Sequence, residues 1–105
     1  SPAITMIQTI IDNGGFVNAF DPIANKNMER LFPDIDYYTT WEDACKNADA
    51  VAIMTEWNEF RGMDLLLLKS LLKSAVVLDT RNILNPKILL ELNFNFDNVG
   101  RKVIE

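Results

Sequence analysis

The pattern of apolar and polar positions predicts helices that alternate with short strands along the whole chain. Near the start, apolar residues recur at positions 3, 4, 7, 10 and 11, which is the spacing of one helical face. Ser1 and Pro2 suit the beginning of this helix, and Gly14-Gly15 suits its end. By the same rules we predict strands over 16–20, 37–39, 50–55, 75–79 and 94–96, and helices from the cap Asp21 to Pro33, over 41–47, from Asp64 to Lys73 and from Pro86 to about Asn93.

Alternation of this kind indicates an α/β fold with a doubly wound parallel sheet in three layers, because helices must cover both faces of the sheet. The run 50–55 lacks polar alternation, so we expect it to be a buried central strand. The chain opens on a helix, whereas a doubly wound domain normally opens on its central strand. We therefore expect residues 1–105 to form one domain that lacks its first central strand, between 16–20 and 50–55. That gap would have to close by rearrangement, be filled by another chain or leave the fold marginal.

Composition narrows the chemistry. The 105 residues are 49% hydrophobic and 24% charged, as in ordinary globular proteins, and the net charge is −5. This acidic balance disfavours nucleic acid and anionic membranes as partners, and the apolar runs fall well short of the ~20 residues of a membrane span. The sequence has no histidine, which excludes imidazole-based catalysis and metal sites within it. The sequence has one cysteine, Cys45, which we expect to be a small core residue. We therefore predict a reduced, cytoplasmic protein that holds no metal.

Polar residues that follow the strands are the candidates for chemistry, since ligands of open parallel sheets bind beyond the carboxyl ends of the strands. Gly14-Gly15 follows a helix and precedes a strand, which is the wrong order for a dinucleotide-binding loop, so we interpret it as a helix stop. Asp21 could stand where a ribose-binding acid stands in dinucleotide folds. Because Pro22 follows it and no glycine loop precedes it, a capping role is favoured.

Two segments offer sharper candidates. The segment 55–61, with Trp57, two acids and Arg61, could clasp a sugar or a nucleotide; alternatively, Trp57 and Phe60 cover the edge of the core while Arg61 pairs with a nearby acid. In the segment 79–82, the guanidinium of Arg81 has forked donors that suit a phosphate or a uracil edge. The competing interpretation of this segment is a turn closed by an Asp79–Arg81 pair.

Several short motifs occur in order along the chain: Ser1-Pro2-Ala3, Phe20-Asp21-Pro22, Ala48-Asp49-Ala50, Thr55-Glu56-Trp57 with Glu59-Phe60-Arg61, Asp79-x-Arg81-Asn82 and Val99-Gly100-Arg101. Together they resemble the C-terminal, nucleotide-sugar-binding domain of the UDP-glucose/GDP-mannose dehydrogenase family. The resemblance covers essentially the whole chain. The Thr-Glu-Trp and Asp-x-Arg-Asn pieces are most similar to the UDP-glucose 6-dehydrogenase branch.

The resemblance implies a Rossmann-like domain that completes the active site for NAD-dependent oxidation of UDP-glucose to UDP-glucuronate. The family binds NAD in an N-terminal domain and carries its catalytic cysteine and lysine in a middle region. This chain is therefore expected to bind the UDP-sugar, to hold no NAD and no catalytic residue, and to be inactive alone. The family's substrate-binding arginine maps onto Arg81, with Asn82 and Trp57 as further expected contacts, whereas Cys45 does not match the family's nucleophile.

The family also has a strand and a lysine-bearing loop just before the Ser-Pro of this chain, which would account for the helix-first opening. Family members associate, so we expect a homo-oligomer. Two other interpretations stay open. One is a free-standing doubly wound nucleotide-binding module in which the Arg81 turn binds a phosphate-bearing ligand. The other is a dimerisation module built on the apolar helices.

Overall fold

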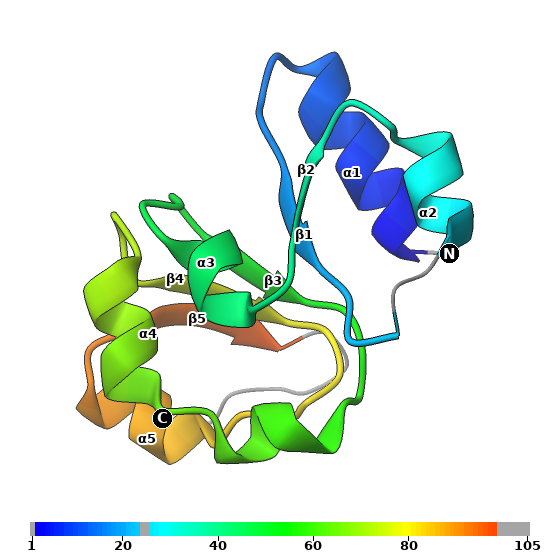
Figure 1. The fold of residues 1–105 in the computed structure, drawn as a ribbon. Helices are drawn as coiled ribbons and strands as arrows, with labels where there is room; N and C mark the ends of the chain where they lie inside the picture. Colours follow the sequence, from blue (N-terminus) through cyan, green and yellow to red (C-terminus); the bar gives the residue numbers. More distant parts are fainter. Residues whose placement is uncertain (1, 24–25, 99–105) are drawn as a thin grey trace. The chain divides into compact units, whose positions relative to one another are not determined.

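A computed structural model describes residues 2–23 and 26–98, and its chain divides into two compact units, Ser1–Ala44 and Cys45–Glu105 (Figure 1). Helices alternate with parallel strands, as the apolar pattern predicts. The strands form two small sheets, one in each unit. The expected cap at Ser1 and the motif piece Val99-Gly100-Arg101 lie outside the described residues.

The first unit is built on a two-stranded parallel sheet. Its elements are α1 (Pro2–Asp12), β1 (Asn18–Phe20), α2 (Lys26–Leu31), β2 (Asp36–Tyr38) and the first residues of α3 (Trp41–Cys45). Gly14 has a φ of 82°, a left-handed conformation that glycine adopts without strain, and it follows the end of α1 as predicted. The carboxylate of Asp21 accepts a hydrogen bond from the Ile23 amide at 2.9 Å. Residues 24–25, between this turn and α2, lie outside the described part of the chain, so the capping role of Asp21 stays a prediction.

The side chain of Tyr37 links β2 to α2 and the residue after it through hydrogen bonds. Its hydroxyl lies 3.0 Å from the carbonyl oxygen of Met28 and 2.8 Å from that of Phe32, and its single proton is shared between these two acceptors. Burial raises the pKa of Tyr37 above its ordinary value of 10.0, and the carboxylate of Glu29 raises this pKa further. The neutral hydroxyl is thus favoured in the folded chain, where it is the donor to both carbonyls.

Replacement of Tyr37 by phenylalanine should lower the free energy of unfolding at neutral pH by about 1 kcal/mol, because two backbone carbonyls lose their donor. The raised pKa also sets the pH dependence. The wild-type contribution is fully present below pH 10 and is lost as the pH rises through the pKa of the folded state. Urea titrations between pH 8 and 11 should therefore bring the wild type and Y37F closer together above pH 10. A constant difference across this range would contradict the assignment.

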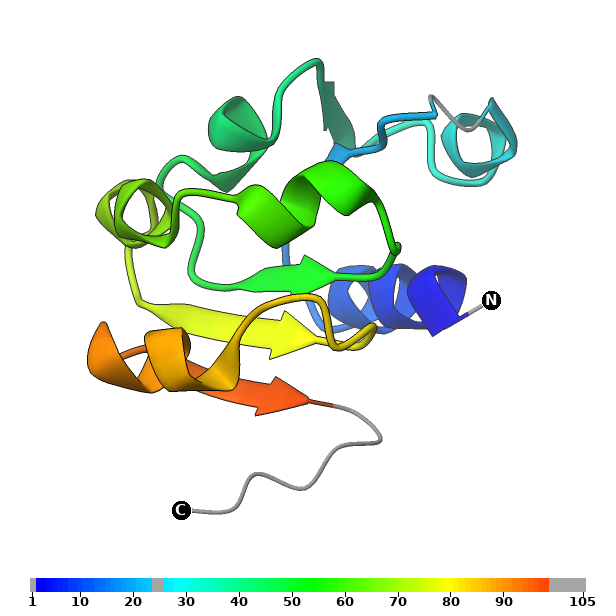
Figure 2. The same cartoon turned by 90° about the horizontal axis from the view of Figure 1, so that it is seen from below.

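The second unit contains a three-stranded parallel sheet in the order β3-β4-β5 (Figure 2). Its elements are β3 (Val51–Ile53), the 3-10 helix η1 (Asn58–Gly62), α4 (Leu65–Leu71), β4 (Val76–Asp79), α5 (Pro86–Glu91) and β5 (Asn95–Asn98). The two predicted helix starts are confirmed by their caps. Asp64 accepts a hydrogen bond from the Leu67 amide at 3.0 Å, and Asn85, directly before Pro86, accepts from the Lys87 amide at 2.9 Å.

The position of the central strand differs from the prediction. The run 50–55 contributes only β3, which lies at an edge of its sheet, and Ala52 is exposed. The strand with a neighbour on each side is β4, whose Val77 is buried together with Leu68 of α4 and Leu89 of α5. An apolar run favours a strand with buried faces, but it does not determine how many strands pair with that strand.

The sheets also bear on the expected missing strand. The two strands predicted to flank it, β1 and β3, belong to different sheets and are not paired with each other in the part of the chain that the structure describes. The parallel α/β class is confirmed, while the three-layer arrangement stays a prediction. Since β3, β4 and β5 are parallel, their carboxyl ends meet at one edge, and the loops that follow them define the candidate site (Figure 2).

Candidate functional site

The loops that follow β3 and β4 are joined at the edge of the sheet. Thr80, the first residue after β4, donates to the Ile53 carbonyl at the end of β3 through its amide at 3.1 Å and through its hydroxyl at 2.7 Å. The two donors hold the start of one loop against the end of the neighbouring strand. Residues on either side of this junction, separated by about 25 positions in sequence, are thereby brought together.

The buried side chain of Asp79 accepts hydrogen bonds from the backbone of the loop after β4. This side chain is 0% exposed, and one carboxylate oxygen accepts the Arg81 amide at 3.1 Å. The other oxygen accepts the amides of Ile83 and Leu84, both at 2.8 Å. A buried carboxylate with three backbone donors fixes the path of the loop over 80–84. Within this turn, Asn82 has a φ of 56°, a left-handed conformation that asparagine tolerates better than most residues.

Arg81 projects from this fixed loop toward the loop after β3. Its Nη2 atom lies 2.6 Å from Oε1 of Glu56, and the two side chains are 47% and 54% exposed. Among the described residues, Glu56 is the acid that pairs with this guanidinium, which also has substantial contact with solvent. The predicted Asp79–Arg81 turn pair exists only through the backbone amide of Arg81, because the carboxylate of Asp79 faces the interior and the guanidinium reaches Glu56.

Trp57 lies in the loop after β3 and packs on Phe60 of η1. The two rings meet edge to face, with centroids 5.1 Å apart and an interplanar angle of 88°. Phe60 is buried and Trp57 is half-buried, so this pair covers an edge of the core, as one of the two sequence interpretations proposed.

The structure brings one unpredicted partner to the site. Arg81 and Asn82 share a loop and Trp57 lies in the neighbouring loop, but the side chain that contacts Arg81 is Glu56. Nothing in the residues 55–61 alone distinguishes Glu56 from Glu59, the other acid of this segment. The position of Glu56 does indicate the contact, because Glu56 and Arg81 each follow a strand of the same parallel sheet by two or three residues.

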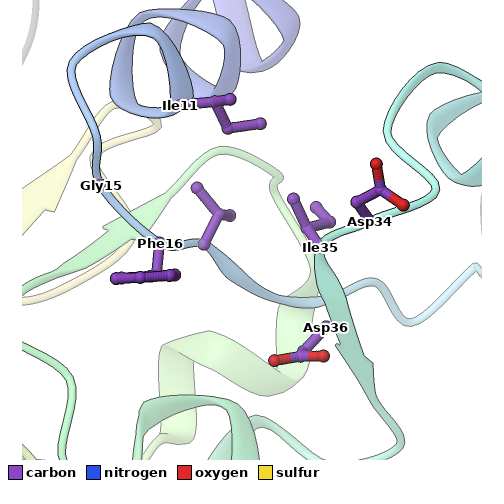
Figure 3. Close-up of a pocket in the computed structure, with 7 residues that line it drawn as sticks. Ile11, Gly15, Phe16, Asp34, Ile35 and Asp36 are labelled. Atoms are coloured by element: carbon purple, nitrogen blue, oxygen red, sulfur yellow. The ribbon is translucent and has the colours of Figure 1, made fainter.

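A pocket in the first unit is less suited to a nucleotide. It measures about 190 Å³ and is lined by Ile11, Gly15, Phe16, Val17, Asp34, Ile35 and Asp36 (Figure 3). The two carboxylates come from β2 and the turn before it, and no cation belongs to the lining. Such a surface would repel a diphosphate, so the candidate site stays with Arg81.

Other chemistry finds little support in the described residues. Cys45 is buried, as expected of a core residue. Over 2–23 and 26–98, no group of three or more His, Cys, Asp or Glu side chains is arranged to hold a metal ion. None of the helices in those segments is both long and apolar enough to span a membrane.

Comparison with known proteins identifies the family of this chain. The profile described as "UDP-glucose/GDP-mannose dehydrogenase family, UDP binding domain" matches residues 1–86. Curated relatives include UDP-glucose 6-dehydrogenases of Rickettsia bellii, 35% identical over 98% of this chain, and of Rhizobium meliloti, 37% identical over 96%. The chain spans about a quarter of their length, 24% and 23% respectively. The match to the profile and these similarities agree, and the chain belongs to the UDP-glucose/GDP-mannose dehydrogenase family, in its UDP binding domain.

Proposed function

We propose that this chain is the UDP-sugar-binding part of an NAD-dependent UDP-glucose 6-dehydrogenase, and that Arg81 is its principal substrate contact. The observation that carries the proposal is the half-exposed guanidinium of Arg81 on a loop fixed at the carboxyl edge of the sheet. The family and its relatives support the substrate class. The proposal extends to a cytoplasmic, homo-oligomeric enzyme in which this chain supplies binding rather than chemistry.

The geometry suits an anionic nucleotide. The backbone of Arg81 is held by the buried Asp79, so little conformational freedom is lost in this loop when a ligand binds. The guanidinium has five N–H donors, and a single contact to Glu56 leaves others for two phosphate oxygens or the edge of a uracil. In the same proposal, Asn82 supplies a short polar group beside Arg81, and Trp57 supplies an aromatic edge to the base or sugar.

The proposal places NAD outside this chain. The glycines at 14 and 15 follow α1 and precede β1, and Gly14 has the left-handed φ of a helix stop, whereas a dinucleotide cradle has the order strand, glycine loop, helix. We therefore place the cofactor elsewhere in the full-length protein and assign no step of hydride transfer to the residues described. The role proposed for this chain is to bind and orient the nucleotide of the substrate.

Hydrogen exchange in the full-length protein tests the proposal. UDP should slow the exchange of backbone amides over 54–57 and 80–84, because ligand contacts restrict the opening of both loops. NAD alone should leave these two segments unchanged. The segment 86–91, which is α5, serves as an internal control. If UDP leaves both loops unprotected, or if NAD protects them equally, the proposed nucleotide site is wrong.

A further inference from the structure

Glu56 is the acidic partner of Arg81 at the candidate site. Its Oε1 atom is 2.6 Å from Nη2 of Arg81, and about half of each side chain is open to solvent. The described residues provide no second ion pair to this guanidinium. Any phosphate that reaches Arg81 must therefore either share the guanidinium with Glu56 or displace it.

The pair is not needed to hold the loops together. Thr80 already joins the loop after β4 to the end of β3, and Asp79 already fixes the backbone of Arg81. Exposed ion pairs of this kind stabilise folded proteins weakly, because water screens both charges. A strong structural role for Glu56 is therefore not expected, and the consequence of its charge falls on the ligand.

That consequence depends on the charge of the ligand. A negative carboxylate beside Arg81 cancels much of the attraction that the guanidinium exerts on a phosphate, while it hardly affects a neutral nucleoside. The other charged side chains of the same segment, Glu59 and Arg61, lie on η1, are exposed and carry opposite signs. Glu56 is thus the acid positioned to oppose phosphate binding at Arg81.

We infer that Glu56 is a specificity-determining residue of the Arg81 site, which weakens binding in proportion to the phosphate charge of the ligand. The inference rests on the proposed function, since it requires the nucleotide to bind at Arg81. In the free protein Glu56 contacts one N–H group of the guanidinium, and a diphosphate that binds to the other donors is repelled by this carboxylate or displaces it. Uridine, which has no phosphate, binds without this competition.

The test is the exchange of Glu56 for glutamine in the full-length protein, followed by calorimetric titration with uridine, UMP and UDP. Glutamine keeps the length and an acceptor oxygen but removes the charge. We expect UDP to bind at least fivefold more tightly to E56Q than to the wild type in low salt, UMP to show a smaller gain and uridine to stay within twofold. Added salt should shrink the gain, because it screens the charge that was removed.

Three variants make the result specific. E56D retains the charge and should keep the wild-type order of affinities. E59Q removes the same charge from an exposed neighbour and should change UDP binding by less than twofold. In an R81A background, the E56Q exchange should no longer improve UDP binding, because the two side chains act on the same ligand group.

The outcomes separate this inference from the proposed function. If R81A weakens UDP binding but E56Q leaves it unchanged or weakens it, Arg81 is a ligand contact and the role given to Glu56 is wrong. Equal gains for uridine and UDP would likewise overturn it, since they would show a change of loop structure rather than of charge. If UDP does not bind the wild-type protein, both the proposed function and this inference fail.

Discussion

Replacement of Asp79 by alanine is expected to destabilise the second unit more than any other single change at the candidate site. The buried carboxylate accepts three backbone amides, those of Arg81, Ile83 and Leu84, and alanine would leave all three without this acceptor. Unsatisfied buried donors cost about 1–3 kcal/mol each, and partial relaxation keeps the sum from being additive, so we expect a loss of roughly 3 kcal/mol or more. The loop that presents Arg81 would lose its fixed path at the same time.

Urea unfolding of the full-length protein, together with hydrogen exchange over 80–84, measures this effect. D79N keeps one acceptor oxygen but turns an amide group toward the remaining donors, so its loss should lie between those of the wild type and D79A. D97A, at an exposed acid of β5, is the matched control and should change stability by about 0.5 kcal/mol or less. Equal behaviour of D79A and D97A would show that the carboxylate of Asp79 does not organise the loop.

Much of the fold could be predicted because its signals are local. The caps Asp64 and Asn85 accept hydrogen bonds from amides two or three residues further along the chain. Gly14 can end α1 because it adopts a positive φ without strain. The order of helices and strands follows from such signals. The edge position of β3 could not be predicted in this way, since it depends on which strands, distant in sequence, pair with it. The burial of α1 could not be predicted from local signals either. Its apolar stripe predicts the helix, yet none of its residues is buried.

Only part of the candidate site could likewise be predicted from local sequence. Arg81 could be identified because it follows a strand, and parallel strands carry polar residues to one edge of their sheet. Its partner could not be identified, because the contact with Glu56 requires β3 and β4 to be neighbours. The spacing of Asp79 and Arg81 suggests that the carboxylate pairs with the guanidinium. The complete burial of Asp79, which directs the carboxylate to backbone amides, is a property of packing that the segment 79–82 does not reveal.

Replacement of Arg81 by alanine should weaken UDP binding by the full-length protein about 10- to 150-fold, since a lost charge-assisted contact is worth roughly 1.5–3 kcal/mol. Stability should change little, because the guanidinium pairs with the exposed Glu56 and the backbone of the loop is held by Asp79. Arg81→Lys is the matched control. Lysine keeps the charge but not the planar fork, so it should recover only part of the affinity.

Kinetics with UDP-glucose distinguish what kind of contact Arg81 makes. The nucleotide lies away from the atoms that react, so a contact to it should be equally strong in the ground state and in the transition state. Under the proposed function, R81A should therefore raise KM while kcat stays nearly constant, as long as chemistry is slower than substrate release. A fall in kcat without a change in KM would instead place Arg81 near the reacting sugar. Unchanged values of both would remove Arg81 from the substrate site, whatever the family resemblance suggests.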